Sequence, residues 1–150
     1  VINMFTSFGY LSSDKEDEKV IKAVYRALKP KGKFILDYVN KDFIIRYYRT
    51  EETKKIDKGD LKITREYNFL KSSHIDTYEI ITDGKTVKKF ISDFRFYSVT
   101  ELARMLVGNG FHILDVFGNY NSESLSFDSK NCIILAEKIW VFVTWKNIMM

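Results

Sequence analysis

The side chains best suited to chemistry in this sequence are polar and aromatic residues that follow apolar runs. Asn3 and Thr6 come after the apolar start of the chain, Asn40 follows a second apolar run, and Arg95 stands among aromatic residues. Asparagine and threonine in such places either bind a ligand or cap the loop that they begin. An arginine among rings either clamps a carboxylate or forms an ion pair at the surface. Each is therefore a candidate for ligand binding, with a structural role as its alternative.

Metal and covalent chemistry find little support in the residues. His74 and His112 are far apart, and neither has cysteines or carboxylates at the spacing of metal ligands. Cys132 lies in the apolar run CIILA without a nearby base in the sequence. This setting is typical of an inert buried thiol rather than of a nucleophile. We therefore expect no metal site and assign no catalytic residue.

Composition predicts one globular domain. The chain has 150 residues, of which 45% are hydrophobic and 29% charged, and is long enough to bury a core. A single cysteine suits a reducing compartment, and the apolar stretches are too short to span a bilayer, so we expect a cytoplasmic protein without membrane contact. The net charge of +4 comes from basic residues interleaved with acidic ones. This interleaving favours a solvated surface, and we expect no nucleic-acid partner.

The first fifty residues have the pattern of an α/β unit. A capping box at residues 13–16 begins a helix with apolar residues at helical spacing, and Pro30 with Gly32 ends it. Residues 34–39 form a nearly continuous apolar run, as in a parallel strand covered on both faces. Asn40 is placed to cap a short helix after this strand. Together these segments predict the later part of a βαβ unit.

The middle of the chain has the alternation of strands with one wet face. Apolar and polar residues alternate over residues 61–69, and further extended runs cover residues 74–82 and 87–97. Asp83-Gly84, between the last two runs, is a hairpin signal that requires positive φ. These runs predict a three-stranded antiparallel β meander, inserted over residues 51–97.

After the meander the pattern returns to a helix and strands. Residues 98–101 form a second capping box, and strands are expected at 111–117 and 131–139. Residues 140–150 form an apolar tail that we expect to dock on the core or on a partner. We therefore divide the single domain, residues 1–150, into an α/β core (1–49 and 98–139), the β insertion and the tail.

Four stretches resemble segments of the class I S-adenosylmethionine-dependent methyltransferases. VINMFTSFGYL is similar to the end of their fourth strand and the loop after it. LKPKGKFILDYVN resembles their L-[KR]-P-G-G turn and fifth strand, with Lys31 in place of the first glycine. RFYSVTELARMLVGNGFHILDVFGNY resembles the last helix and sixth strand, and SKNCIILAEK resembles the antiparallel seventh strand. The resemblance implies an α/β fold with a partial Rossmann-like sheet, whose strands are equivalent to the fourth to seventh.

The chain departs from this family where the cofactor is held. The family uses a Gly-rich loop after its first strand and an acidic residue at the end of the second. This sequence has 7 glycines and no G-x-G-x-x-G, and its one G-x-G, at residues 108–110, ends the second predicted helix instead of following a first strand. We therefore expect the C-terminal, substrate-side portion of a methyltransferase. The intact parent would bind S-adenosylmethionine, and this chain alone would bind it weakly or not at all.

The resemblance places residues that leave the carboxyl ends of strands beside the ligands. It implies that the cofactor contacts Asn3, Met4, Phe5 and Thr6. It implies that the methyl acceptor faces seven further residues, which are Phe8, Tyr10, Tyr38, Asn40, Arg95, Tyr97 and Tyr120. For each ring the alternative is packing in the core. Methyl transfer is an in-line displacement, in which the enzyme mainly positions the reactants and aromatic faces stabilise the sulfonium.

Two further expectations concern the methyl acceptor and the assembly of the protein. The opening NMFTSFGY lacks the N-P-P-Y pattern of DNA and protein amide methylators, which favours a small-molecule acceptor. The alternative function is a noncatalytic α/β interaction module. Such a module would form a homodimer, or pair with another chain, through an open sheet edge or the apolar tail.

Overall fold

The structure is a computed structural model that describes residues 1–139, and its strands form two sheets. The first sheet contains, in spatial order, β1 (Ile2–Asn3), β2 (Lys33–Val39), β8 (Asn131–Lys138) and β7 (Phe111–Phe117). β1 runs parallel to β2, and β8 lies antiparallel to both of its neighbours. The predicted partial α/β sheet with an antiparallel final strand is therefore confirmed.

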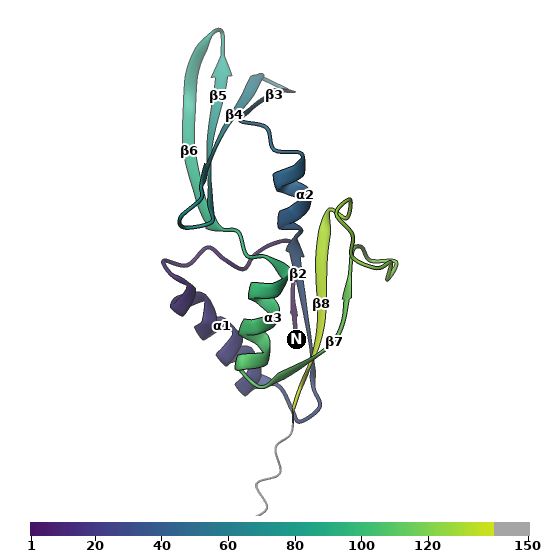
Figure 1. Cartoon of the computed structure of the whole chain (residues 1–150). Helices are drawn as coiled ribbons and strands as arrows, with labels where there is room; N and C mark the ends of the chain where they lie inside the picture. The colour runs from purple at the N-terminus through teal and green to yellow at the C-terminus, as the bar shows by residue number, and fades with distance from the viewer. Residues whose placement is uncertain (140–150) are drawn as a thin grey trace, which may run out of the picture.

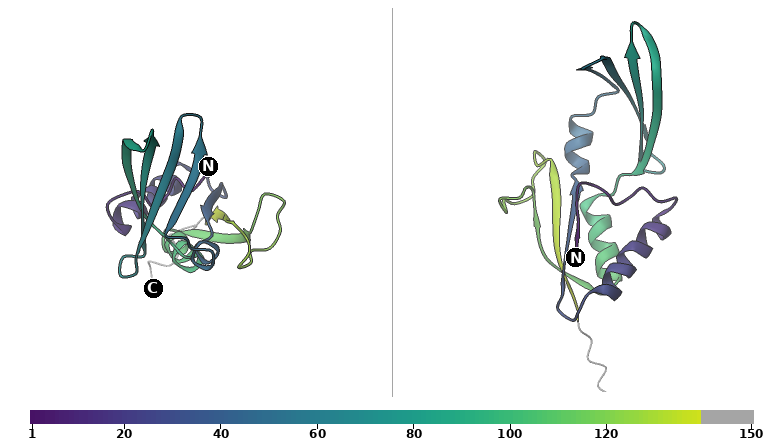
Figure 2. Two further views of the ribbon diagram at one scale, coloured as in Figure 1. Left: turned by 90° about the horizontal axis from the view of Figure 1, so that it is seen from above. Right: turned by 180° about the vertical axis from the view of Figure 1, so that it is seen from behind.

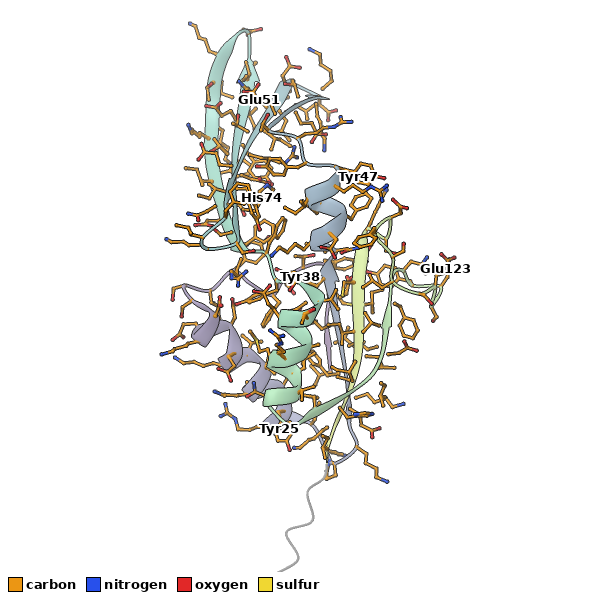
Figure 3. All side chains as sticks on the ribbon, in the orientation of Figure 1. Tyr25, Tyr38, Tyr47, Glu51, His74 and Glu123 are labelled. Atoms are coloured by element: carbon orange, nitrogen blue, oxygen red, sulfur yellow. The ribbon has the colours of Figure 1, made fainter. Side chains whose placement is uncertain are left out.

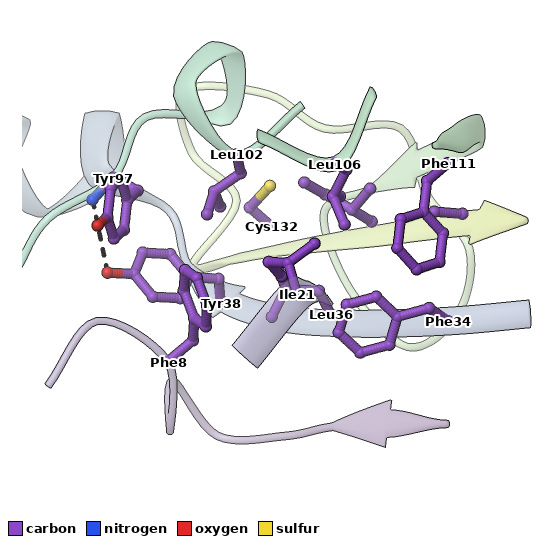
Figure 4. Packing of buried hydrophobic residues seen from close by; sticks show 12 residues of the cluster. Phe8, Ile21, Phe34, Leu36, Tyr38, Tyr97, Leu102, Leu106, Phe111 and Cys132 are labelled. Carbon is purple, nitrogen blue, oxygen red and sulfur yellow. Dashed lines mark hydrogen bonds between the residues drawn. The ribbon is translucent and has the colours of Figure 1, made fainter. Parts of the chain in front are cut away.

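Two helices cover one face of this sheet, as Figure 1 shows. They are α1 (Asp14–Ala27) and α3 (Val99–Gly108). Their buried residues meet the apolar side chains of β2, β7 and β8 in one core. Figure 4 shows this packing around Ile21, Leu36 and Leu106, each at most 1% exposed. Burial of this kind, at roughly 25 cal/mol per Å² of apolar surface, is the main force that holds the helices on the sheet.

The meander forms a second sheet, stacked on the carboxyl end of β2 with α2 (Lys41–Arg46) beside it (Figures 1 and 2). It contains β3 (Glu51–Ile56), β4 (Gly59–Asn68), β5 (Ser73–Thr82) and β6 (Lys85–Arg95), paired antiparallel in that order. The predicted hairpin is confirmed, because Asp83 and Gly84 have φ of 51° and 73°.

The meander has four strands where three were expected. The additional strand is β3, whose sequence EETKKI shows no apolar alternation and leaves mostly exposed side chains. Backbone pairing with β4 and cross-strand charges hold it, including a 2.7 Å ion pair between Lys55 and Asp60. A pattern search for apolar alternation misses such a strand, because pairing rather than burial defines it.

Each helix begins at the cap that the sequence predicts. Ser98 and Glu101 form a complete capping box on α3, with the Glu101 N–H donating to Ser98 Oγ and the Ser98 N–H to Glu101 Oε2. On α1 the Ser13 hydroxyl accepts from the Glu16 N–H, but the Glu16 carboxylate pairs with Lys19 at 2.6 Å, so the predicted box is only half formed. Asn40 caps α2 by accepting from the Asp42 N–H.

The two serine caps predict unequal losses of stability. Ser98→Ala should lower the free energy of unfolding by about 1–2 kcal/mol, because Ser98 Oγ serves both the Glu101 N–H and the Glu101 carboxylate. Ser13→Ala should cost about 0.5–1 kcal/mol, because its hydroxyl caps through one bond at the surface. Urea unfolding of both variants measures the difference. An equal or larger loss in Ser13→Ala would contradict this ranking.

Two further expectations concern the turn before β2 and the end of the chain. Lys31, which stands where the family pattern has glycine, adopts φ of 58°. This left-handed conformation costs a residue with a side chain roughly 1–2 kcal/mol.

The predicted apolar tail, residues 140–150, lies outside the described residues. Among residues 1–139 no helix is long and apolar enough to cross a membrane.

Candidate functional site

A cleft of about 770 Å³ lies between the first sheet and the meander. Thr6 and Tyr10 from the loop after β1 form one part of its wall, and Val39 at the end of β2 lies beside α2 in another part. The opposite wall is the inner face of the meander. Aromatic side chains line much of the cleft, namely Tyr10, Phe43, Tyr47, Tyr48, Tyr78, Phe94 and Phe96. A concave site at the carboxyl ends of strands is the usual place for a ligand in an open α/β sheet.

The loop after β1 turns sharply at the entrance to this cleft. Phe5 and Thr6 have φ of 57° and 54°, a region that residues with side chains rarely adopt. Asp37 on β2 fixes this turn through two hydrogen bonds. Its carboxylate accepts from the Phe5 N–H at 2.9 Å, and its backbone carbonyl accepts from the Thr6 N–H at 3.2 Å.

Asp37 is fully buried, and its carboxylate joins three parts of the chain. Besides the Phe5 N–H it accepts from the Tyr120 hydroxyl at 2.7 Å and from Asn131 Nδ2 at 2.9 Å. Hydrogen bonds to a buried carboxylate are stronger than neutral ones. Asp37 is therefore a positioning residue for the loop, and the sequence analysis did not single it out.

Of the four residues predicted to contact the cofactor, Asn3 ends β1, and Met4, Phe5 and Thr6 begin the loop after it. Asn3 Oδ1 accepts from the Ser7 hydroxyl at 2.9 Å, and the Met4 carbonyl accepts from the same hydroxyl at 2.8 Å. The Phe5 ring is 82% exposed, and Thr6 lines the cleft. The structure thus brings them together in one turn, and their contact with a cofactor stays a prediction.

Three of the residues predicted to face the acceptor lie in the core. Phe8, Tyr38 and Tyr97 are at most 2% exposed and pack on one another, with the Phe8 and Tyr97 ring centroids 5.6 Å apart (Figure 4). The Tyr38 hydroxyl donates to the Arg95 carbonyl, and burial raises the pKa of Tyr38 above its ordinary value of 10. Core packing was the stated alternative for these rings, and no contact with an acceptor follows from their positions.

The other predicted acceptor residues have different surroundings. Tyr10 lines the cleft and stacks on Phe94, with ring centroids 5.0 Å apart. Asn40 is 1% exposed and donates to the carbonyls of Ser126 and Ser129, so its side chain fixes the loop before β8. Tyr120 is 60% exposed while its hydroxyl reaches Asp37. Of these three, Tyr10 is the one that lines the cleft.

Arg95 joins the meander to the two core helices. Its guanidinium contacts Glu101 at 2.6 Å and Asp14 at 3.1 Å, and it donates to the Phe96 carbonyl at 2.8 Å. It also lies over the Tyr97 ring, 4.6 Å from the centroid. The carboxylates that Arg95 clamps therefore belong to the protein itself.

The cleft contains a polar cluster that the sequence analysis missed. His74 and Asp76 of β5 line it together with Tyr48 and with Arg65 of β4. Asp76 Oδ1 lies 3.4 Å from His74 Nε2 and 3.8 Å from Arg65 Nε. Arg65 donates to Glu52 of β3 at 2.8 Å. Figure 3 places His74 on the meander, on the side of α2.

His74 is held in its neutral form. Burial lowers the pKa of His74 below its ordinary value of 6.5, and the Arg65 charge lowers the pKa further. The Asp76 carboxylate acts in the opposite direction but does not outweigh burial. A neutral imidazole offers one nitrogen as a hydrogen-bond acceptor inside the cleft.

A signal for this cluster is present in the sequence. His74, Asp76 and Tyr78 alternate along β5, so they share one face of the strand. Register places Arg65 opposite Asp76 on the neighbouring strand. Polar residues at alternate positions on the face that carries Phe94 indicate an inward-facing polar site. A pattern of apolar alternation does not reveal this site, because the residues that form it are polar.

Cys132 does not line the cleft. Cys132 is 1% exposed in the core, and burial raises the pKa of its thiol to about 12, which matches the predicted inert thiol. Within residues 1–139 no three His, Cys, Asp or Glu side chains gather as metal ligands would.

The fold is that of the S-adenosylmethionine-dependent methyltransferases, as comparison with solved structures shows. The CcbJ methyltransferase from Streptomyces caelestis superposes with a TM-score of 0.81 at 13% identity, over 93% of this chain and 56% of its own. An S-adenosylmethionine-dependent methyltransferase from Clostridium acetobutylicum gives 0.74 at 18% identity, over 93% of this chain and 57% of its own. An amino pentose methyltransferase from Micromonospora echinaspora gives 0.58 at 11% identity, over 91% and 56%.

The chain thus spans little more than half the length of the solved structures that it matches. No protein-family model and no curated protein matches the sequence.

Proposed function

We propose that this chain is the acceptor-side portion of an S-adenosylmethionine-dependent methyltransferase that acts on a small molecule. The observation that carries the proposal is the aromatic cleft, which opens at the carboxyl ends of β1 and β2 under a β meander. The methyltransferase fold supports it, and so does the share of each solved neighbour that the chain covers.

The loop after β1 fits a cofactor site in two respects. Asp37 fixes the Phe5–Thr6 turn where the loop meets the cleft, so that Thr6 lies in the cleft wall. The exposed Phe5 ring beside it presents a free aromatic face. When bound, S-adenosylmethionine supplies an electrophilic methyl group on a sulfonium, and aromatic faces stabilise such a cation. We propose that residues 3–6 form the edge of this cofactor site.

The cleft would position the acceptor. A volume of about 770 Å³ accommodates a small organic molecule but not a folded macromolecule. Tyr10 and Phe94, stacked on each other, form an apolar part of the wall near the loop after β1. The polar cluster around Asp76 supplies polar groups in the same cleft. The contribution of this chain is therefore orientation and exclusion of water, which suits an in-line displacement.

Binding of the cofactor tests the proposal. We expect the longer protein that contains this chain to bind S-adenosylmethionine at micromolar Kd in calorimetry and to transfer its radiolabelled methyl group to a small molecule. Residues 1–150 alone should bind at least about 100-fold more weakly, because they contain no Gly-rich loop. Micromolar binding by residues 1–150 would contradict the assignment of the main cofactor contacts to another part of the protein. No binding by the longer protein would contradict the methyltransferase proposal itself.

The alternative of a noncatalytic interaction module stays a prediction. It rests on the edge of β1, where the Ile2 side chain is 62% exposed beside an unpaired strand edge of the described sheet. The cleft has no part in that alternative, and for this reason we favour the enzyme.

A further inference from the structure

The polar cluster in the cleft contains three buried atoms without a hydrogen-bond partner. They are Tyr48 Oη, His74 Nε2 and Asp76 Oδ1, and all three residues line the cleft. The side chains of His74 and Asp76 are 5% and 9% exposed. A buried polar atom left unpaired costs roughly 1–3 kcal/mol. Three such atoms in one cleft, two of them on β5 and one in the segment between α2 and β3, indicate that a ligand supplies the missing bonds.

The chemistry of these atoms defines the missing group. Asp76 Oδ1 accepts hydrogen bonds, the Tyr48 hydroxyl can also accept, and neutral His74 offers Nε2 as an acceptor when its proton is on Nδ1. Asp76 Oδ2 is already used, since the Tyr78 hydroxyl donates to it at 2.9 Å. An ammonium group carries three donors and no acceptor, which matches the three unpaired atoms in number and in kind.

Charge in the cluster favours the same group. Arg65 lies closer to Glu52, at 2.8 Å, than to Asp76 Oδ1, at 3.8 Å, and so leaves this oxygen without a donor. Two other cations that line the cleft, Arg49 and Lys130, are exposed to solvent. A buried carboxylate is stabilised by a cation that comes close enough to hydrogen-bond.

Aromatic rings surround the cluster and suit the organic part of such a ligand. The His74 ring stacks on Phe96 at 4.9 Å, and its centroid lies 5.7 Å from Tyr48 and 5.8 Å from Phe94. Rings of this kind attract a cation through their faces and pack against its carbon frame.

We propose that Tyr48, His74 and Asp76 bind the ammonium group of an amine. This deepens the proposed function, on which it rests, by naming the acceptor of the methyltransferase as an amine-bearing small molecule. The site acts by holding the acceptor at the meander end of the cleft.

Binding to residues 1–150 without cofactor tests the site independently of methyl transfer. The probe is phenethylamine, and its uncharged analogue 2-phenylethanol is the matched control ligand. In ¹⁵N NMR at pH 7.5 we expect saturable shifts of the amide signals of Tyr48, His74 and Asp76 with the amine. The alcohol should bind at least about tenfold more weakly, since it lacks the charge that Asp76 pairs.

Two variants and one control variant complete the test. Asp76→Asn should weaken binding of the amine at least about tenfold, and Tyr48→Phe should weaken it severalfold, because each loses one acceptor. Asp93→Asn should leave it unchanged, because Asp93 is an exposed carboxylate on β6 that lies opposite Ile75 rather than Asp76. If Asp76→Asn fails to fold, the site is tested by amine binding to Tyr48→Phe and by comparing amine and alcohol binding to the unaltered chain.

Some outcomes separate this site from the proposed function. Equal binding of amine and alcohol, or no saturable shifts with the amine, would overturn the ammonium site while leaving the methyltransferase proposal in place. Unchanged binding by a folded Asp76→Asn variant would do the same. Saturable binding of the amine by residues 1–150, combined with no binding of S-adenosylmethionine by the longer protein, would support the ammonium site and overturn the methyltransferase proposal.

Discussion

Replacing Asp37 with alanine is expected to lower the free energy of unfolding by about 3–5 kcal/mol. The change removes the carboxylate that accepts from the Phe5 N–H, the Tyr120 hydroxyl and Asn131 Nδ2. Asp37 is fully buried, so the Phe5 N–H and Asn131 Nδ2 lose their partner inside the structure, whereas the Tyr120 side chain is 60% exposed and can turn to water. The Phe5 N–H would then lose the partner that offsets the cost of its positive φ.

Urea unfolding of the variant measures this loss, and hydrogen exchange at the Phe5 amide locates it. Asp115→Ala is the matched control, because Asp115 is an exposed carboxylate on β7 and should change stability by no more than about 0.5 kcal/mol. A loss below about 1 kcal/mol in Asp37→Ala, or unchanged protection of the Phe5 amide, would show that Asp37 does not hold the loop.

Replacing Arg95 with alanine is expected to lower the free energy of unfolding by about 2–4 kcal/mol. The side chain is 18% exposed and binds Glu101 at 2.6 Å and Asp14 at 3.1 Å. These contacts connect the end of β6 to α3 and to the start of α1. Their loss should loosen the meander on the core, and with it the opposite wall of the cleft. Arg104→Ala, an exposed arginine on α3, is the control and should have little effect.

The pH dependence of stability provides a second measurement of the same contact. Burial raises the pKa of Glu101, but the Ser98 N–H and Arg95 outweigh it and lower the pKa from 4.5 to about 2. A carboxyl with a lowered pKa stabilises the folded state above pH 4.5 and loses this effect as the pH falls toward 2. The loss between pH 4.5 and 2 should be smaller in Arg95→Ala. An unchanged pH profile would mean that Arg95 does not stabilise the Glu101 carboxylate.

Much of the fold could be predicted because its signals are local. The helix after Ser13 depends on a cap and an apolar stripe, and the hairpin at Asp83-Gly84 depends on two residues with positive φ. β3 could not be found in this way. Its side chains are mostly exposed, and its existence depends on pairing with β4, which the sequence of β3 does not encode in its pattern.

The candidate site was less predictable for a related reason. A ring that fills a core and a ring that lines a cleft have the same type and spacing, so Phe8 and Tyr10 could not be separated by sequence. The two side chains lie two residues apart, one 2% exposed and the other in the cleft wall. His74 and Asp76 become a site through the register of β5 with β4, which is a property of the assembled sheet.

The meander lies between β2 and β8 in the sequence, although these two strands are neighbours in the sheet, and this has a consequence for how the chain folds. The two central strands of the first sheet, β2 and β8, pair Lys33 with Glu137 and Val39 with Asn131. The chain between them contains α2, the whole meander, α3 and β7. Closing so long a loop is entropically costly and slows folding, whereas the hairpins of the meander close short loops. A meander that has already formed shortens the chain that must be closed before β8 can pair. The element that covers the cleft in the native state would thus also speed the completion of the sheet beneath it.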